Sequence, residues 1–306
     1  MNSAPDLVCL ANLLVDDIVF PDGRTVMGEA GGAALHFSLA AALFGARVGI
    51  VSVRGDDYSE AALATLAARG VDLAGIRPLG RDGVRTWLLY EPLGRRVIHR
   101  LGSPAHSEVS PTPADIPPAW RAARAFHLSP MPLDVQSALV THLAPHSGVA
   151  ISLDPHEQVR EDNVDAWKAV LAHTDAFFPS EDDLQLEGVT TDPRPALRRL
   201  AGGRLRFVAF KRGREGGVLY DARQGAFHEW PPVPRLTGDP TGAGDAFAGG
   251  FLAAILGGGS VESALDQGVI ATSFAIEDLG ARGLMAATRE EAERRRREWL
   301  GSKADA

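Results

Sequence analysis

Cysteine is nearly missing from this chain of 306 residues, which has Cys9 as its single example. One cysteine cannot form an intramolecular disulfide, and it cannot build a thiolate metal site. We therefore expect a reducing compartment, the cytoplasm. The chain also lacks a basic N-terminal segment with a long apolar core, and no run approaches the roughly 18 apolar residues of a membrane span. We expect neither export nor a membrane partner.

The chain also has no excess of positive charge. Lysine and arginine number 31 against 39 acidic residues, a formal net charge of −8. This balance gives no electrostatic reason to expect a nucleic-acid partner. Four consecutive arginines at 294–297 lie among glutamates, which predicts a solvated helix face. A helix start with capping-box spacing, Thr288 and Glu291, precedes them.

Two common phosphate-binding motifs are absent. A Walker A loop needs a lysine directly after a glycine, which none of the three lysines satisfies. A dinucleotide fingerprint needs G-x-G-x-x-G after the first strand, but Gly242-x-Gly244 has Phe247 at the third glycine position and lies far along the chain. A Rossmann oxidoreductase therefore stays only as an alternative reading.

Short apolar runs alternate with segments of helical periodicity. Runs that predict buried strands cover 7–10, 48–53, 125–128, 149–153, 176–178 and 207–210. Helical periodicity covers 34–44, 59–68, 133–143, 164–173, 243–256 and 261–278. This alternation predicts a mostly parallel sheet with helices on both faces. No internal repeat or low-complexity linker divides the chain, so we expect a single domain over 1–306.

One region breaks the alternation. Segments 84–91 and 97–101 flank a Pro-Leu-Gly-Arg turn at 92–95, which predicts an antiparallel hairpin. Together with the stretch 15–27, this hairpin would form a small β lid made of the segments 15–27 and 84–101. Trp87 and Leu89 lie on one face of the hairpin, and Val84, Thr86, Leu88 and Tyr90 lie on the other. Both faces therefore carry large side chains that we expect to be buried against other parts of the protein. We therefore expect a homodimer through the lid; a decorative edge hairpin is the alternative.

The segment 239–251 carries the chemistry. Its sequence, DPTGAGDAFAGGF, runs a glycine-rich turn directly into an apolar helix. Unpaired N–H groups and the positive end of the helix dipole converge there, which predicts an anion site. Asp245 adds a carboxylate in the first turn, where a substrate hydroxyl would meet a bound phosphate. A purely structural helix start is the alternative. Gly249 and Gly250 cost the helix roughly 1 kcal/mol each, which indicates close packing or a ligand.

The stretch 239–252 resembles the C-terminal signature of the PfkB family of carbohydrate kinases. The resemblance implies a ribokinase-like three-layer αβα sandwich and ATP-dependent transfer of the γ-phosphate to a hydroxyl of a small sugar. It implies Asp245 as catalytic base and the N–H groups of Gly242, Ala243 and Gly244 as anion hole. Without a Walker lysine, Mg2+ and these N–H groups would neutralise most of the developing charge.

The resemblance also covers the substrate side. Asp16 follows the first strand as a family ligand for substrate hydroxyls, with Asp17 as the alternative. Gly31 and Gly32 match a Gly-Gly motif at which the backbone approaches the sugar. His36 stands where the family commonly has Asn, which implies altered specificity; a packing role is the alternative. Further along, Arg54 occupies a normally apolar place, where it would meet an acidic or phosphorylated substrate or form a surface salt bridge.

On the nucleotide side, the segment 211–216 resembles the family's Gly-x-x-Gly turn. It offers Lys211, Gly213 and Gly216 as ATP contacts. The family's N-x-x-E motif, linked to magnesium and phosphate, appears as Ser180 and Asp183, which implies weaker or water-mediated Mg2+ handling. The positions that hold a monovalent cation such as K+ in some members are matched by Asp239 and Thr241.

Two further readings stay open. Nucleoside kinases resemble this family too, and Trp87, Tyr90 and His36 would supply ring contacts to a base unless they form lid core. A catalytically weakened sugar-binding protein is suggested by Ser180 and Asp183. The intact Asp245 and glycine turn argue against that second reading.

Overall fold

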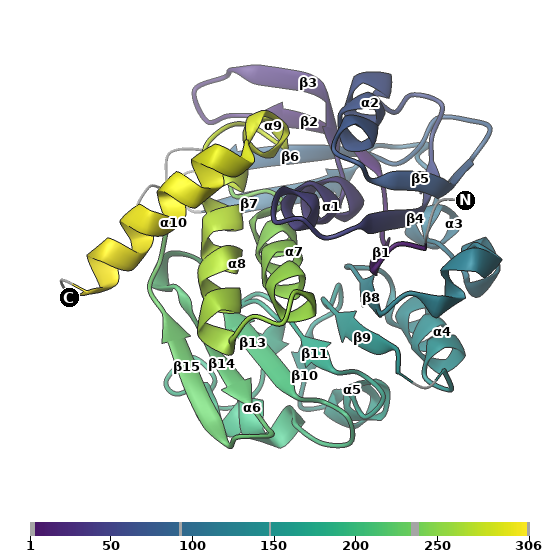
Figure 1. Ribbon diagram of the computed structural model, residues 1–306. Helices are drawn as coiled ribbons and strands as arrows, with labels where there is room; N and C mark the ends of the chain where they lie inside the picture. Colours follow the sequence, from purple (N-terminus) through teal and green to yellow (C-terminus); the bar gives the residue numbers. More distant parts are fainter. Residues whose placement is uncertain (1–3, 92–93, 147, 234–238, 305–306) are drawn as a thin grey trace.

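A nine-stranded sheet runs through the centre of the computed structural model, which describes residues 4–91, 94–146, 148–233 and 239–304 (Figure 1). Its strand order is β15-β14-β13-β11-β9-β8-β1-β4-β5. Seven strands are parallel: β1 (Leu7–Leu10), β4 (Val48–Arg54), β5 (Asp72–Pro78), β8 (Ala125–Leu128), β9 (Ala150–Leu153), β11 (Ala176–Phe177) and β13 (Phe207–Lys211). At one edge, β14 (Gly217–Asp221) and β15 (Ala226–Trp230) are antiparallel.

Helices cover both faces, because successive strand residues point to opposite sides. Leu7 and Cys9 belong to one hydrophobic core, and Val8 and Leu10 to the other. The first core is covered by α1 (Ala33–Leu43), α2 (Glu60–Ala68), α7 (Ala243–Leu256), α8 (Val261–Ala275), α9 (Arg282–Ala286) and α10 (Arg289–Ala304). The second is covered by α4 (Leu133–Leu143), α5 (Val164–Leu171) and α6 (Arg194–Leu200). The predicted α/β sandwich is confirmed.

The two glycines inside α7 allow three helices to pack closely. A Cβ at Gly249 would lie 2.4 Å from the carbonyl oxygen of Phe37 on α1. A Cβ at Gly250 would lie 2.7 Å from the carbonyl oxygen of Gln267 on α8. The close-packing interpretation of these glycines is therefore correct, and Figure 1 shows the three helices side by side.

A separate four-stranded sheet forms the lid. Its order is β3-β2-β6-β7, with β2 (Leu14–Val19), β3 (Thr25–Gly31), β6 (Arg85–Glu91) and β7 (Gly94–His99). Across it, Arg85 binds both carboxylate oxygens of Asp17 at 2.6 and 2.8 Å. The predicted accessory sheet is confirmed. Residues 92 and 93 of the predicted turn lie outside the described residues, and β7 already begins at Gly94.

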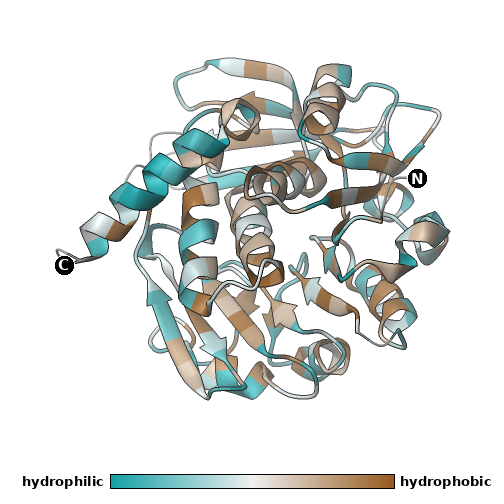
Figure 2. Cartoon of the chain, in the orientation of Figure 1, coloured by the Kyte–Doolittle hydropathy of each residue, from teal (hydrophilic) through white to brown (hydrophobic). Residues whose placement is uncertain are grey.

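Other boundaries differ from the predictions. Helix α8 ends at Ala275 rather than at 278, and β5, β14, β15, α6 and α9 were not predicted. At the start of α10, Thr288 Oγ1 accepts a hydrogen bond from the N–H of Glu291, 3.2 Å away, while the Glu291 carboxylate pairs with Arg294 and Arg295. Of the two hydrogen bonds of a capping box, the one accepted by the Thr288 side chain therefore forms, while the Glu291 carboxylate is engaged by arginines. Figure 2 shows α10 as the most hydrophilic helix, and no helix in the described ranges is long and apolar enough to cross a bilayer.

Smaller elements complete the second face and the loops. They are α3 (His106–Val109), β10 (Val159–Arg160) and β12 (Leu184–Gln185), of which the last two pair in parallel.

Candidate active site

Polar and charged residues, two of them predicted as site residues, gather at the edge of the sheet where the parallel strands end. Asp154 follows β9, Ser180 follows β11, and Lys211 is the last residue of β13. Helix α7 begins at the same edge, because Gly244 lies against Lys211. In open α/β sheets this carboxyl edge is where ligands bind.

Asp245 lies in the first turn of α7. Gly242 precedes the helix as N-cap with φ 75°, a left-handed conformation that favours glycine. Asp245 is half-buried, but its Oδ1 is shielded from solvent and has no hydrogen-bond partner among the described residues. Burial raises the pKa of the Asp245 carboxyl, and the charges of His36 and Lys211 oppose this rise. A carboxylate oxygen that lacks a partner in such a place is ready to accept a proton from a ligand.

His36 packs directly on the predicted anion hole. A Cβ at Gly242 would lie 2.0 Å from Cδ2 of the His36 ring. The His36 side chain is buried; its Nδ1 is 3.2 Å from the carbonyl oxygen of Gly32, and its Nε2 has no partner among the described residues. The residue that departs from the family pattern therefore bridges the Gly-Gly motif and the start of α7.

Lys211 brings a positive charge to the predicted anion hole. Its Nζ is 2.6 Å from Oδ2 of Asp154, and a Cβ at Gly244 would lie 2.8 Å from the same Nζ. Burial raises the pKa of Asp154 to about 7, despite the opposing charge of Lys211. From the sequence, Lys211 was predicted only as part of the nucleotide turn, and no motif indicated Asp154. The expectation that magnesium and the backbone N–H groups neutralise most of the developing charge, in the absence of a Walker lysine, stays a prediction.

The carboxylate of Asp16 is packed closely against Gly31 of the Gly-Gly motif. A Cβ at Gly31 would lie 1.9 Å from Oδ2 of Asp16, and a Cβ at Gly32, whose φ is 96°, would lie 2.3 Å from the carbonyl oxygen of Asn12. Asp16 is buried, and burial together with the charge of Asp239 raises its pKa to about 7. Asp17 is engaged with Arg85 instead. This contrast favours Asp16 as the carboxylate available to a substrate.

Asp239 and Thr241 connect the α7 turn to the lid. Asp239 Oδ1 accepts hydrogen bonds from the N–H of Thr241, at 2.9 Å, and from the hydroxyl of Tyr90, while its Oδ2 accepts from the N–H of Gly280 at 3.2 Å. The guanidinium of Arg95 donates to Thr241 Oγ1. No cluster of three or more His, Cys, Asp or Glu suited to a metal ion occurs in the described parts of the chain. A cation at Asp239 and Thr241 stays a prediction.

The nucleotide-side residues form two tight turns. The N–H and hydroxyl of Ser180 both donate to Asp183 Oδ2, at 2.8 and 2.5 Å. Gly213 and Gly216 have φ of 47° and 75°, and a Cβ at Gly216 would lie 2.0 Å from the carbonyl oxygen of Trp230. The Gly-x-x-Gly turn therefore exists as predicted, whereas its contact with ATP stays a prediction.

Arg54 forms a salt bridge with Glu60 at the start of α2, which is one of the two roles the sequence left open. The other role, contact with an acidic or phosphorylated substrate, stays a prediction.

A histidine cluster beside this site was not predicted. The ring centroids of His106 and His156 are 4.8 Å apart, and those of His106 and His99 are 6.0 Å apart. His106 Nε2 is 2.5 Å from Nδ2 of Asn12, two residues after β1. Burial, followed by the charge of His156, lowers the pKa of His106 to about 4. Asn12, the pair His99 and His106, and His156 come from three separate segments and share no motif, so no local pattern indicates the cluster.

The fold and the site define a phosphotransferase of the α/β class. A family model described as "pfkB family carbohydrate kinase" matches residues 6–288, and the chain belongs to that family. It is a kinase whose acceptor is a sugar or a nucleoside.

Two relatives are each 31% identical to the chain over 272 residues. The cytidine kinase of Thermococcus kodakarensis is covered over 93% of its length, using 86% of this chain. The ATP-dependent ribose-1-phosphate kinase of Halopiger xanaduensis is covered over 84%, using 83% of this chain. An E. coli structure named ribokinase II, in complex with ATP and Mg2+, superposes with a TM-score of 0.75 at 23% identity over 94% of this chain and 98% of that one. The ribokinase-like fold is thereby confirmed.

Proposed function

We propose that the chain transfers the γ-phosphate of ATP to a hydroxyl group of a small sugar or nucleoside, with Asp245 as general base. The observation that supports this proposal most strongly is Oδ1 of Asp245, which is shielded from solvent and has no hydrogen-bond partner among the described residues. It lies in the first turn of α7, beside the Gly242–Gly244 backbone and the ammonium group of Lys211. A base, an anion hole and a cation therefore lie at one place, the arrangement that phosphoryl transfer requires.

In this proposal the nucleotide lies along the Gly213 and Gly216 turn, with its γ-phosphate at the start of α7. Asp16 holds the acceptor hydroxyls against the Gly31–Gly32 backbone. Asp245 takes the proton of the attacking hydroxyl as the new O–P bond forms and the bond to the ADP oxygen breaks. Lys211 stabilises negative charge on the moving phosphoryl group, because its Nζ lies against Gly244.

Magnesium fits the edge formed by Ser180 and Asp183. Asp183 accepts both Ser180 bonds through Oδ2, so we assign its Oδ1 to a magnesium-bound water. The ion would neutralise the charge of the nucleotide phosphates. A monovalent cation such as K+ would lie at Asp239 and Thr241, whose oxygens are the ligands that such ions take. The relative solved with ATP and Mg2+ supports the cofactor assignment.

The histidine cluster favours a nucleoside as acceptor. Asn12 Oδ1 and His106 Nδ1 are shielded and have no hydrogen-bond partner among the described residues. With its pKa lowered to about 4, the His106 ring is neutral at pH 7 and offers hydrogen bonding and a flat face without charge. A neutral heterocyclic base fits these groups, and two relatives named cytidine kinase and nucleoside kinase are consistent with it.

Lid pairing gives the proposed homodimer. Among the described residues, four of the five exposed large hydrophobic side chains belong to the lid or follow it directly: Met27 (48%), Val97 (52%), Ile98 (48%) and Leu101 (98%). Exposed apolar groups gathered on one sheet indicate a surface that is covered by another molecule. We assign a second copy of this chain as that molecule. We also place the protein in the cytoplasm and take its kinase domain to span 1–306.

A substrate panel tests the proposed function. ADP release is measured with ATP, Mg2+ and a series of sugars and nucleosides, each at several concentrations. The proposal predicts ADP release that depends on the acceptor, with nucleosides at a higher kcat/KM than their free sugars. If none of the tested sugars and nucleosides causes ADP release, kinase activity is contradicted. That result would favour the sugar-binding protein suggested by Ser180 and Asp183.

A further inference from the structure

Two side chains of the lid bind the turn that leads into α7. Tyr90 on β6 and Arg95 on β7 lie directly opposite each other in the antiparallel pair, so their side chains point to the same face of the lid. The Tyr90 hydroxyl donates to Asp239 Oδ1 and is 3.3 Å from Thr241 Oγ1. Nη1 of Arg95 is 2.5 Å from the same Thr241 oxygen. Since Thr241 directly precedes Gly242, the N-cap of α7, the lid reaches the predicted anion hole.

The same face of the lid is turned towards the candidate active site. His99 lies four residues after Arg95 on β7, so the two-residue period of a strand places both side chains on one face. The ring centroid of His99 is 6.0 Å from that of His106, whose Nε2 is 2.5 Å from Nδ2 of Asn12. Arg95 is therefore on the side of the lid that faces the space proposed for the acceptor.

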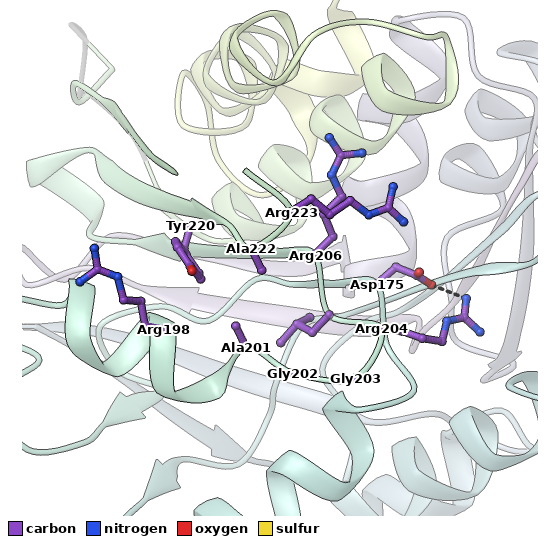
Figure 3. Close-up of a pocket in the computed structure, with 11 residues that line it drawn as sticks. Asp175, Arg198, Ala201, Gly202, Gly203, Arg204, Arg206, Tyr220, Ala222 and Arg223 are labelled. Carbon is purple, nitrogen blue, oxygen red and sulfur yellow. Dashed lines mark hydrogen bonds and ion pairs between the residues drawn. The ribbon is translucent and has the colours of Figure 1, made fainter. Parts of the chain in front are cut away.

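The guanidinium of Arg95 has donors to spare. Among the described residues it has no carboxylate partner, and Thr241 Oγ1 is the only atom to which it donates. At the opposite edge of the sheet, by contrast, Arg204 is bound to the carboxylate of Asp175 at 2.6 Å, as the dashed line in Figure 3 shows. Arg95 is also exposed, so a ligand can reach its remaining N–H groups.

The charge of Arg95 acts on both carboxylates proposed for the reaction. Burial raises the pKa of Asp16 to about 7 and the charge of Asp239 adds to this rise, whereas the charge of Arg95 opposes it. Burial also raises the pKa of Asp245, and Arg95 is again among the charges that oppose the rise. A charge that acts on the acceptor ligand and on the general base lies near the place where acceptor and base meet.

Arg95 and Lys211 lie at the two ends of the predicted anion hole. A Cβ at Gly244 would lie 2.8 Å from Nζ of Lys211, while Arg95 is bound to Thr241 at the other end of the turn. Lys211 belongs to β13 of the central sheet, and Arg95 belongs to the lid. A phosphoryl group at this turn would therefore meet one cation from each side. The planar fork of a guanidinium suits two oxygens of one phosphoryl group.

We propose that Arg95 is a catalytic residue contributed by the lid, and that its guanidinium binds oxygens of the phosphoryl group during transfer from ATP to the acceptor. This inference rests on the proposed function of the site. Arg95 supplies charge only: the acceptor O–P bond forms, the bond to ADP breaks, and the hydroxyl proton goes to Asp245. Tyr90 positions Arg95 by fastening the lid to Asp239. The site is therefore complete only when the lid lies against the start of α7.

Single-turnover transfer at varied acceptor concentration, with K+ held constant, tests this role. We expect Arg95→Ala to slow the maximal rate at least ~10²-fold, because a donor to the transition state is lost. The half-saturating acceptor concentration should stay nearly unchanged, since the lost contact is made only in the transition state. Arg95→Lys keeps the charge but not the fork, so its rate should lie between the two. Thermal unfolding checks that the fold of each variant is retained.

Two further variants separate this chemistry from the surface charge and from the fastening of the lid. Arg96→Ala removes the neighbouring exposed arginine, which is paired with Glu91 and lies on the other face of β7, and it should transfer normally. Tyr90→Phe removes the hydroxyl that binds Asp239 but keeps the ring stacked on Phe20, so we expect a loss of at most ~10-fold, the scale of one hydrogen bond.

The outcomes distinguish the role of Arg95 from the proposed function. If the unchanged chain transfers no phosphoryl group to any tested acceptor, the proposed function fails, and the role of Arg95 with it. If the unchanged chain is active, the role of Arg95 alone is overturned by any of three results. These are near-normal transfer by Arg95→Ala, an equal loss in Arg96→Ala or Tyr90→Phe, and a rise in the half-saturating acceptor concentration with the maximal rate unchanged.

Discussion

Lys211 and Asp154 form an ion pair at the carboxyl edge of the sheet, with Nζ 2.6 Å from Oδ2. The pair joins the ends of β13 and β9, and it holds the ammonium group against Gly244 at the start of α7. The chain thus has a lysine beside the predicted anion hole even though it lacks a Walker motif. Under the proposed function, this ammonium group would stabilise the moving phosphoryl group together with the backbone N–H groups.

Replacing Lys211 by methionine tests that charge. We expect Lys211→Met to lower kcat/KM for ATP at least ~10²-fold, because a group that stabilises transition-state charge is lost. The change also leaves Asp154 buried without its partner, which destabilises a fold by about 3–5 kcal/mol when the acid stays ionised. Steady-state kinetics and urea unfolding are measured together.

The double variant Lys211→Met/Asp154→Asn separates the two effects. It contains no unpaired buried charge, so its free energy of unfolding should lie closer to that of the unchanged chain, while its activity stays low. Recovery of activity along with stability would show that Lys211 has a purely structural role.

Gly31 is predicted to be essential for binding of the acceptor. A Cβ there would lie 1.9 Å from Oδ2 of Asp16, so Gly31→Ala must displace that carboxylate. We expect KM for the acceptor to rise at least ~10-fold, with KM for ATP nearly unchanged, since a misplaced ligand group costs about one charged hydrogen bond. Gly301→Ala is the control, because a Cβ at Gly301 meets no atom within 4 Å. Equal effects on both KM values would argue against Asp16 as the acceptor ligand.

The pKa of Asp16 predicts the pH dependence of stability. Burial raises it to about 7 from 3.8, so the folded chain binds more protons than the unfolded chain between these values. Stability must therefore fall as the pH rises through this window, by up to about 1.4 kcal/mol per pH unit for one group. Asp16→Asn should unfold like the unchanged chain near pH 4 and be more stable at pH 8. A difference that does not grow with pH would contradict an ionisable, buried Asp16.

Light scattering tests pairing through the lid. We expect a dimer at micromolar concentration, and a monomer for Ile98→Glu, because a charge on the exposed face of β7 opposes burial. Leu300→Glu is the control: Leu300 is exposed to a similar extent, 42%, but lies on α10. A monomeric unchanged chain, or a dimer that persists in Ile98→Glu, would rule out this interface.

Features that depend on neighbours in the sequence were predicted well. The glycine turn, the start of α7 and the close packing at Gly249 and Gly250 follow from one continuous segment. The same holds for strands buried on both faces, such as β1, whose residues are all apolar. Edge strands were missed because they are less apolar than the central strands: β5 contains Asp72 and Arg77, and β15 contains His228 and Glu229.

Contacts between distant segments could not be predicted. Lys211 and Asp154 are 57 positions apart, and Asn12 and His106 are 94 apart. Each lies at the end of a different element, so only the order of strands in the sheet brings them together.

Asp245→Asn is the most direct test of the kinase mechanism. The amide keeps the shape of the side chain but cannot accept the proton of the acceptor hydroxyl. We predict that single-turnover phosphoryl transfer slows at least ~10²-fold, while thermal unfolding occurs at the same or a higher temperature, because a carboxylate whose Oδ1 is shielded from solvent is replaced by a neutral amide. Near-normal phosphoryl transfer by a well-folded Asp245→Asn protein would contradict Asp245 as the base, and with it the proposed chemistry of this site.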